Sequence, residues 1–366
     1  MAEMIARTRQ KDYPIRIRTG LLGEIGENLE ANFRSRRILV LSDENVAPLY
    51  QAKVLRSLYQ AGIQTASLTL PAGEASKSPE ALNRLYTALF MSDIGKRDAL
   101  LALGGGVIVQ LAGVAAATYL RGIRLIQAPT SLFAQIDSAV GGRSTINMPF
   151  AADAVGLCYL PFMVCSDPSS LRSLPPEEMQ TGMAEAVRCA LIRDANLFER
   201  LERRSVDLEW LVRRCVGIKT EILRGDTDSG RGEHRLLNFG KPMADAVLRL
   251  GHEADLHWGE ALELGMLLTA GLGECAGRTE AGTMERLRQV LTANGLRRGF
   301  DGLEAGLLAD SLRRAARLSQ GGQPGQNEEG QETISLVLLE HVGRVCQEQF
   351  GYERLERMLE DLLHSL

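Results

Sequence analysis

A histidine at the expected start of a helix is the first candidate for metal chemistry in this sequence. The segment DLHWGE, residues 255–260, places His257 three positions before the carboxylate of Glu260. A catalytic zinc ion takes three protein ligands, often histidine and carboxylate side chains, and keeps one position open. A histidine-bound metal must draw on the five histidines of the chain: His234, His252, His257, His341 and His364. The number of suitable partners therefore decides whether a metal site exists.

Three consecutive glycines form a second candidate site, for a phosphate group. Gly104, Gly105 and Gly106 follow an apolar strand and precede the expected helix of residues 107–119. Without Cβ atoms, such a turn lets a diphosphate approach the backbone N–H groups at the positive end of a helix. Glycine triplets also serve as tight turns, so the triplet alone leaves both interpretations open.

Polar residues stand at the ends of three other expected strands. The sequence Asp-Glu-Asn closes one strand at residues 43–45, PAGEASK follows another at 71–77, and Pro-Thr-Ser follows a third at 129–131. Nucleotides bind outside the carboxyl ends of the strands in open parallel sheets. The clustering of polar groups at these ends therefore favours a nucleotide site.

The elements that position these groups alternate between β-rich runs and helical periodicity, which predicts βαβ units on a parallel sheet. The helices include residues 46–62 and 78–93, and the second begins with a serine cap and Pro79 in its first turn. The expected strands are residues 13–19, 36–43, 65–71, 99–105 and 123–129.

The alternation stops near Ser166, and amphipathic helices follow from Pro176 to about Gln320. We therefore predict an α/β protein with an N-terminal parallel-sheet nucleotide-binding domain, residues 1–170, and a mainly α-helical C-terminal domain, residues 171–366. A glycine- and glutamine-rich segment, residues 319–332, is expected to form a mobile loop before a strand pair and a closing helix.

Composition and charge argue against several classes of partner. The chain has 366 residues and a net charge of −4, which gives no general electrostatic reason to bind nucleic acid or an anionic membrane. The start has no apolar core typical of a signal peptide, and the apolar run near residues 113–120 ends at Arg121 before it could span a bilayer. We expect a cytoplasmic protein whose six cysteines, none in a CxxC pair, are reduced.

Five further motifs, together with the glycine triplet and the strand ends, closely resemble those of dehydroquinate synthase and its sugar-phosphate cyclase relatives. The similarity runs in order from about Asp43 to His257 and beyond. The motifs are AAATYLRGI (115–123), AQIDSAVGG (134–142), GMAEAVR (182–188), LLNFG (236–240) and HWGEALELGM (257–266).

The resemblance implies a dehydroquinate synthase-like fold, with an NAD-binding α/β domain and a helical domain that carries a divalent metal, usually zinc. It implies the carbon–oxygen lyase reaction of the shikimate pathway of aromatic amino acid biosynthesis. In that reaction NAD transiently oxidises a hydroxyl of a heptulosonate phosphate, phosphate is eliminated, the ketone is reduced back, and the ring recloses. A homodimer is implied too, in which Arg121 reaches across the interface.

The resemblance assigns cofactor roles to residues at the strand ends. Two positions depart from the family pattern GGGVIGD, because Val109 and Gln110 replace its glycine and aspartate. An amide can still bond a ribose hydroxyl, whereas a branched valine could crowd a closely approaching cofactor. The matching NAD positions are Asp43, Asn45, Glu74, Lys77, Gly104, Gly105, Gly106, Thr130 and Ser131.

The substrate positions implied by the resemblance match unevenly. Arg143 and Arg188 replace lysines, which keeps the charge but loses the compact ammonium group. Ala152 and Asp153 replace the lysine and asparagine of the GKN segment, and Ser319 and Gln320 stand near the place of two late lysines. The anion clamp is therefore weaker than in the family. The positions that keep the family's residue type are Arg121, Asp137, Asn147, Lys219 and Asn238.

The metal ligands implied by the resemblance are a glutamate, matched by Glu185, and two histidines. Lys241 stands in place of the first histidine. The second aligns with Trp258 without a gap, or with His257 if one residue is inserted. A lysine ammonium cannot coordinate a metal, so zinc or cobalt is doubtful, and we predict that Lys241 pairs with Glu185 and Asp245. His257 is then expected to be a helix-end residue or an orphaned ligand.

Three functions remain open from the sequence. The first is a cyclase-family enzyme, a dehydroquinate synthase or a relative with another substrate, with impaired or altered activity. The second is a catalytically silent homologue that acts as a binding or assembly partner. The third is a metal-independent enzyme in which Lys241, Arg143 and Arg188 bind another anionic substrate. The buried Asp137 is expected to pair with Lys219 or an arginine in any of these cases.

Overall fold

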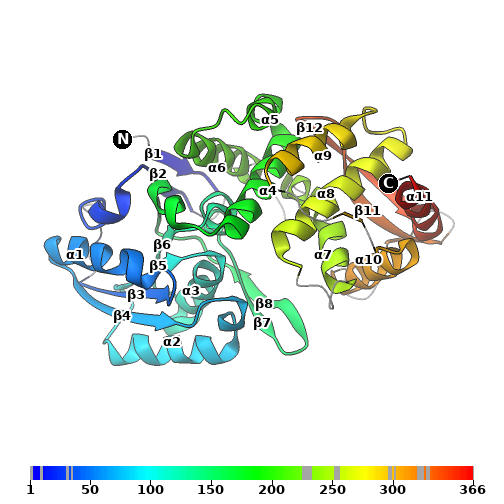
Figure 1. Ribbon diagram of the computed structural model, residues 1–366. Helices are drawn as coiled ribbons and strands as arrows, with labels where there is room; N and C mark the ends of the chain where they lie inside the picture. Colours follow the sequence, from blue (N-terminus) through cyan, green and yellow to red (C-terminus); the bar gives the residue numbers. More distant parts are fainter. Residues whose placement is uncertain are drawn as a thin grey trace. The chain divides into compact units, whose positions relative to one another are not determined.

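The computed structural model describes residues 3–8, 11–29, 33, 36–224, 233–250, 256–295, 299–300, 302–319, 325–326 and 330–365. The chain divides into two compact units (Figure 1). Unit 1 contains residues 1–179 and 207–224, and unit 2 contains residues 180–206 and 225–366. The domain boundary at residues 170 and 171 stays a prediction.

Unit 1 is built on a seven-stranded sheet in the order β1-β2-β9-β6-β5-β3-β4, in which only the edge pair β1–β2 is antiparallel. All five predicted strands are confirmed. The strands are β1 (Glu3–Ala6), β2 (Tyr13–Ile17), β3 (Arg37–Asp43), β4 (Gln64–Leu70), β5 (Ala99–Gly104), β6 (Arg124–Pro129) and β9 (Met163–Ser166).

Helices cover both faces of this sheet because its central strands are apolar on both sides. Alternate residues of β3 and β5 pack with α2 (Pro79–Met91) and α3 (Gly106–Thr118) on one face. The residues between them pack with α1 (Ala52–Gln60) on the other face. The second part of the chain returns to unit 1 as α6 (Leu208–Arg224), and β7 (Arg143–Met148) and β8 (Ala151–Cys158) form a hairpin.

Short helical turns complete unit 1. The 3-10 turns are η1 (Leu21–Glu24), η3 (Glu74–Ser76), η4 (Tyr119–Arg121) and η6 (Pro168–Ser173), and the π turns are η2 (Ala47–Gln51) and η5 (Ala134–Ser138).

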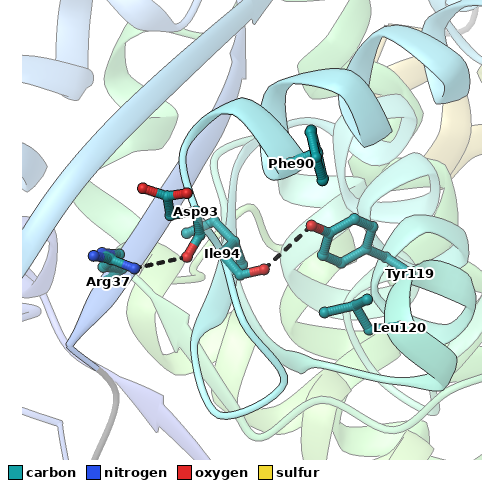
Figure 2. A pocket seen from close by; sticks show the side chains of 6 residues that line it. All are labelled: Arg37, Phe90, Asp93, Ile94, Tyr119 and Leu120. Carbon is teal, nitrogen blue, oxygen red and sulfur yellow. Dashed lines mark hydrogen bonds between the residues drawn. The ribbon is translucent and has the colours of Figure 1, made fainter.

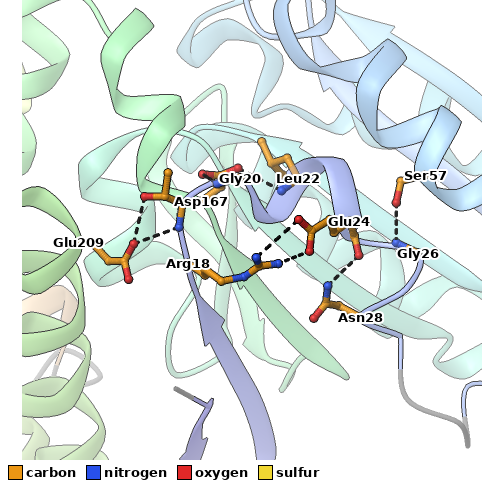
Figure 3. Close-up of polar contacts among 10 residues, drawn as sticks. Arg18, Gly20, Leu22, Glu24, Gly26, Asn28, Ser57, Asp167 and Glu209 are labelled. Carbon is orange, nitrogen blue, oxygen red and sulfur yellow. Dashed lines mark hydrogen bonds and ion pairs between the residues drawn. The ribbon is translucent and has the colours of Figure 1, made fainter. Parts of the chain in front are cut away.

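The buried carboxylate of Asp167 ties the turn after β2 to the turn after β9 (Figure 3). It accepts hydrogen bonds from the backbone N–H groups of Gly20 at 2.9 Å and Leu22 at 3.0 Å. It also accepts from the backbone N–H of Ser169 at 3.0 Å and from its hydroxyl at 2.6 Å. One side chain, 1% exposed, thus satisfies donors from η1 and η6.

Within the residues that the structure describes, unit 2 is mainly helical, as predicted. Its helices are the greater part of α4 (Pro176–Arg193), then α5 (Ala195–Glu202), η7 (Glu233–Asn238), α7 (Lys241–Leu250), α8 (Trp258–Cys275), α9 (Thr283–Ala293), α10 (Ala305–Ser319) and α11 (Tyr352–His364). The strand pair and closing helix are confirmed as β11 (Glu332–His341), β12 (Arg344–Gly351) and α11, with β10 (Gly325–Gln326) beside β11. Most of the predicted mobile loop lies outside the described residues.

Helix α8 is buried over most of its length and forms the centre of unit 2. Residues 259–273 of α8 are apolar except for Glu260, Glu263 and Thr269, which is the pattern of a helix enclosed by protein. In the part of the chain that the structure describes, we find no helix with the length and apolarity needed to cross a membrane.

Candidate functional site

The predicted nucleotide residues of unit 1 meet at one edge of the sheet. The ends of parallel strands coincide there, because Asp43 pairs with Leu70 and Gly104 pairs with Pro129. The backbone N–H of Thr130 donates to the carbonyl oxygen of Gly104 at 3.0 Å. β3 and β5 are themselves neighbours, with Leu41 paired with Ala102. The structure therefore brings together four strand ends that lie far apart in the sequence.

The glycine triplet joins β5 to α3, and its members have different packing. A Cβ atom on Gly104 would lie 2.7 Å from the Cβ of Ile108, so packing requires a glycine there. A Cβ on Gly105 would meet its nearest neighbour, the Ser131 hydroxyl oxygen, at 3.6 Å, an ordinary contact. Gly105 is the N-cap residue of α3 and is free to serve a ligand rather than the core. Val109 is fully buried, so its side chain has no exposed surface with which to crowd a cofactor.

Asp43 shapes the turn after β3. Its Oδ1 atom accepts hydrogen bonds from the backbone N–H groups of Asn45 and Val46, both at 3.0 Å. Burial raises the pKa of this carboxyl, and the two N–H donors partly oppose that effect. Asn45 is thereby held at the strand end.

A polar network joins Lys77 to the β7–β8 hairpin. The Lys77 side chain, 4% exposed, forms ion pairs with Asp153 and with Glu74, the latter at 3.4 Å. Asn147 donates from Nδ2 to Glu74 at 2.9 Å and accepts from the backbone N–H of Asp153 at 2.9 Å. The Thr145 hydroxyl lies within hydrogen-bond distance of Asp153.

The same hydroxyl of Thr145 contacts Gln110 in α3. Two departures from the family pattern, Gln110 and Asp153, are therefore parts of one network with Lys77. No sequence pattern predicts this network, because it depends on the positive φ of 54° at Asp153 and on the return of the β7–β8 hairpin.

Asp137 in η5 pairs with Lys219 in α6, as predicted. The Lys219 ammonium forms an ion pair with the Asp137 carboxylate and donates to its backbone oxygen at 2.8 Å. Arg143 is exposed at the start of β7, where its charge opposes the rise that burial causes in the pKa of Cys158. Arg121, at the end of η4, has a positive φ of 60°.

In unit 2, Glu185 is held by Arg188 one turn further along α4. The guanidinium donates from Nε to Oε2 at 3.0 Å and from an NH2 group to Oε1 at 2.5 Å, and both side chains are buried. This contact uses both carboxylate oxygens. The predicted Lys241–Glu185 and Lys241–Asp245 pairs stay predictions.

The other predicted residues of unit 2 lie near the starts of α7 and α8. Lys241 begins α7, and its Nζ lies 5.8 Å from the ring centroid of Trp258, the first residue of α8. His257 is the exposed N-cap residue of α8, and its backbone N–H donates to Glu260 at 3.1 Å. This agrees with the prediction of a helix-end residue. Asn238 is exposed at the end of η7.

The described residues contain no cluster of three or more histidine, cysteine, aspartate or glutamate side chains that could hold a metal ion. Glu185 and His257 are the described donors that the resemblance assigned to a metal, and one of them is engaged by Arg188. The side chains of Ser319 and Gln320 are not part of the described structure.

The buried carboxyl of Glu263 in α8 is a candidate functional group that was not predicted from the sequence. It is 1% exposed and accepts a hydrogen bond from Nε2 of Gln180 at 3.1 Å. Burial raises its pKa to about 8, the Gln180 hydrogen bond opposes this rise, and the charge of Glu260 adds to it. The available signal was a lone carboxylate inside the apolar run ALELGMLL.

A shallow pocket of about 570 Å³ lies in unit 1 apart from the strand ends (Figure 2). Arg37 donates to the backbone oxygen of Asp93 at 2.9 Å, and the Tyr119 hydroxyl donates to that of Ile94 at 3.2 Å. The pocket is lined by Arg37, Phe90, Asp93, Ile94, Tyr119 and Leu120. None of these is a predicted site residue.

Comparison with solved structures identifies the class of fold. The chain is similar to 2-deoxy-scyllo-inosose synthase complexed with carbaglucose-6-phosphate, NAD+ and Co2+, with a TM-score of 0.84, 19% identity and coverage of 98% of this chain and 99% of that one. It is also similar to 2-epi-5-epi-valiolone synthase from Streptomyces hygroscopicus subsp. jinggangensis with NAD+ and Zn2+ bound, with a TM-score of 0.83, 21% identity and coverage of 99% and 100%. The fold is that of the sugar-phosphate cyclases.

Sequence comparison gives the family. Residues 67–181 match the model of the 3-dehydroquinate synthase N-terminal domain, and residues 182–315 match that of the C-terminal domain. The 3-dehydroquinate synthase of Latilactobacillus sakei is 40% identical over 273 residues, which cover 73% of this chain and 76% of the relative. That of Clostridium kluyveri is 33% identical over 345 residues, which cover 93% and 92%. The chain belongs to the 3-dehydroquinate synthase family.

Proposed function

We propose that this 3-dehydroquinate synthase-like protein binds NAD at the strand ends of unit 1, and that its synthase activity is impaired or altered. The observation that carries the NAD proposal is the meeting of Gly105, Asp43 and Thr130 at one edge of the parallel sheet. The cyclase relatives named above were solved with NAD+ bound, which supports the same cofactor here.

Gly105 is the residue through which the diphosphate would be held. It stands at the N-terminus of α3, where backbone N–H groups point outward and the helix dipole favours negative charge. Ser131 lies beside it and offers a hydroxyl. Asn45, fixed by the Asp43 turn, supplies an amide at the neighbouring strand end. Packing does not require a glycine at position 105, so a purely structural role for the turn does not explain this residue. A role in binding a dinucleotide does.

The impaired or altered activity is inferred from the charges near Lys77. Asp153 binds the Lys77 ammonium, so the positive charge of Lys77 is offset within the chain. Ala152 supplies no cation beside it. An incoming phosphorylated substrate would meet a carboxylate next to the lysine, and this like charge opposes its binding. We propose a small anionic substrate that is held more weakly than in the family.

Gly105→Ala is expected to weaken NAD binding by about tenfold or more while leaving the fold intact. The added methyl group has room in the protein at 3.6 Å, but it occupies the space through which a diphosphate would approach. An overpacked contact costs about 1–3 kcal/mol, and 1.4 kcal/mol is tenfold in affinity. Isothermal titration calorimetry with NAD measures the change.

Gly351→Ala is the matched control, because a Cβ there meets nothing within 4 Å and the residue lies in unit 2. It should leave NAD affinity unchanged. Equal affinity in Gly105→Ala and the unchanged protein would refute the assignment of the glycine turn. No NAD binding by the folded protein would refute the cofactor itself.

We also propose a cytoplasmic homodimer. Three large apolar side chains, Phe90, Met91 and Leu120, are 73%, 75% and 47% exposed, and two of them line the pocket beside Arg121. Exposed apolar groups gathered in this way are typical of a protein–protein contact. Sedimentation velocity should show a dimer that Leu120→Asp weakens, and a monomer at micromolar concentration would contradict the proposal.

A further inference from the structure

The starts of α7 and α8 pack closely against other parts of unit 2 because glycines allow it. A Cβ on Gly259 would lie 2.7 Å from the Cα of Thr181 in α4. A Cβ on Gly240 would lie 3.0 Å from the Cα of Met266, and one on Gly265 would lie 2.4 Å from the carbonyl oxygen of Gly240. These contacts fix the first residues of both helices.

Glu185 belongs to the same region. It lies one helical turn after Thr181, and residues four apart share a face of a helix. Thr181 itself packs against the residue that follows Trp258. The α4 face that carries Glu185 therefore lies beside the start of α8, and residues 241 and 258 are the positions that the resemblance matches to the family's metal-binding histidines.

Lys241 and Trp258 have the wrong chemistry for metal ligands. An ammonium has three donors and no lone pair, and an indole nitrogen is a donor only. The Nε1 atom of Trp258 is buried and has no hydrogen-bond acceptor within the described part of the chain. Where a metal requires lone pairs, both side chains present N–H groups.

The side chains of Lys241 and Trp258 instead interact with each other. The Lys241 Nζ lies 5.8 Å from the centroid of the Trp258 ring, within the range of a cation–π interaction. The carboxylate of Glu185 is likewise satisfied by a cation from the protein, since Arg188 contacts both of its oxygens. A divalent ion would have to displace the Arg188 guanidinium from a buried carboxylate and would find no histidine at position 241 or 258.

We infer that the Lys241 ammonium, positioned over Trp258, replaces the divalent metal as a permanent cation of unit 2, and that this unit takes up no zinc or cobalt. Lys241, Trp258 and Arg188 act together in this replacement. The inference concerns unit 2 and goes beyond NAD binding by unit 1, so either can fail without the other.

The test is a titration of the full-length protein with Co2+, with the visible absorption spectrum and the metal content after desalting as readouts. The unchanged protein should retain far less than one ion per chain. The variant Arg188→Lys/Lys241→His/Trp258→His should retain about one ion and show the absorption of four-coordinate cobalt. Arg188→Lys alone is the control and should retain none, because Lys241 and Trp258 are still present.

Stoichiometric cobalt in the unchanged protein, lost in Glu185→Gln, would overturn the inference. A folded triple variant without cobalt would overturn it too, because Lys241 and Trp258 would not be what excludes the metal. If the triple variant does not fold, the Tm values of Lys241→Met, Trp258→Leu and the double variant decide. The two changes should be non-additive, and simple additivity would contradict the Lys241–Trp258 interaction.

Discussion

Glu263→Gln is expected to remove a large pH dependence from the stability of this protein and to stabilise it at alkaline pH. Glu263 is 1% exposed, and its hydrogen bond within the described residues comes from a neutral amide, that of Gln180. No ion pair to it is found in the described ranges. A buried carboxylate without a cation is unfavourable, so the folded protein keeps this group protonated up to a pKa of about 8.

The sign of this change of stability with pH follows from the pKa values of Glu263 in the unfolded and folded states. The ordinary pKa of 4.5 describes the unfolded chain, and the folded value is higher. Between the two, the unfolded state has released its proton while the folded state retains it, so unfolding becomes more favourable as pH rises. Stability should fall between pH 4.5 and about pH 8 and then level off. The loss is at most about 5 kcal/mol, because each pKa unit corresponds to about 1.4 kcal/mol.

Urea unfolding between about pH 5 and about pH 9 measures the slope of the free energy of unfolding against pH. Glu263→Gln should flatten it, since a glutamine has no proton to lose. Glu285→Gln, at a position whose side chain is 64% exposed, is the matched control and should leave the slope intact. A protein whose stability is constant from about pH 5 to about pH 8 would contradict the buried, protonated state of Glu263.

Asp167→Ala is expected to lower the free energy of unfolding of unit 1 by about 3 kcal/mol or more. The change removes the acceptor of three backbone N–H groups, those of Gly20, Leu22 and Ser169. Each buried donor left without a partner costs about 1–3 kcal/mol. Chemical unfolding, followed by circular dichroism, measures the loss.

Asp207→Ala is the control for this prediction. Asp207 is an exposed residue that accepts from the backbone N–H of Trp210 at 3.0 Å near the start of α6, and the loss of such a cap costs about 1 kcal/mol. If Asp167→Ala and Asp207→Ala lower the free energy of unfolding by similar amounts, the view that Asp167 joins two segments of unit 1 is wrong. Asp167→Asn should fall between them, because it keeps one acceptor oxygen.

The sequence predicted the parallel sheet well because its central strands are apolar and lie between helices that begin with clear signals, such as Ser78 and Pro79. The β7–β8 hairpin escaped prediction. Its second strand, AADAVGLC, is exposed along nearly its whole length and shows no alternation of buried and exposed residues. Strands that bury neither face leave no period in the sequence.

The candidate site was predictable where a physical need was evident. Asp137 in an apolar segment needed a cation, and Lys219 supplies it. By contrast, the Asp153 carboxylate reaches Lys77 from 76 residues away. That ion pair forms because the β7–β8 hairpin brings Asp153 close to Lys77, and no pattern in the nearby sequence predicts this contact. Lys241 was recognised as unsuited to metal, but its position over Trp258 follows from the packing of α7 on α8 and required the structure.

The decisive measurement is phosphate release from the heptulosonate phosphate by purified protein with NAD and added Zn2+ or Co2+. We expect slow or undetectable release that neither metal nor a chelator changes, from a protein that is folded and binds NAD. Rapid release that requires the metal and is lost in Glu185→Gln would contradict this expectation, because unit 2 would then complete a metal site despite Lys241 and Trp258.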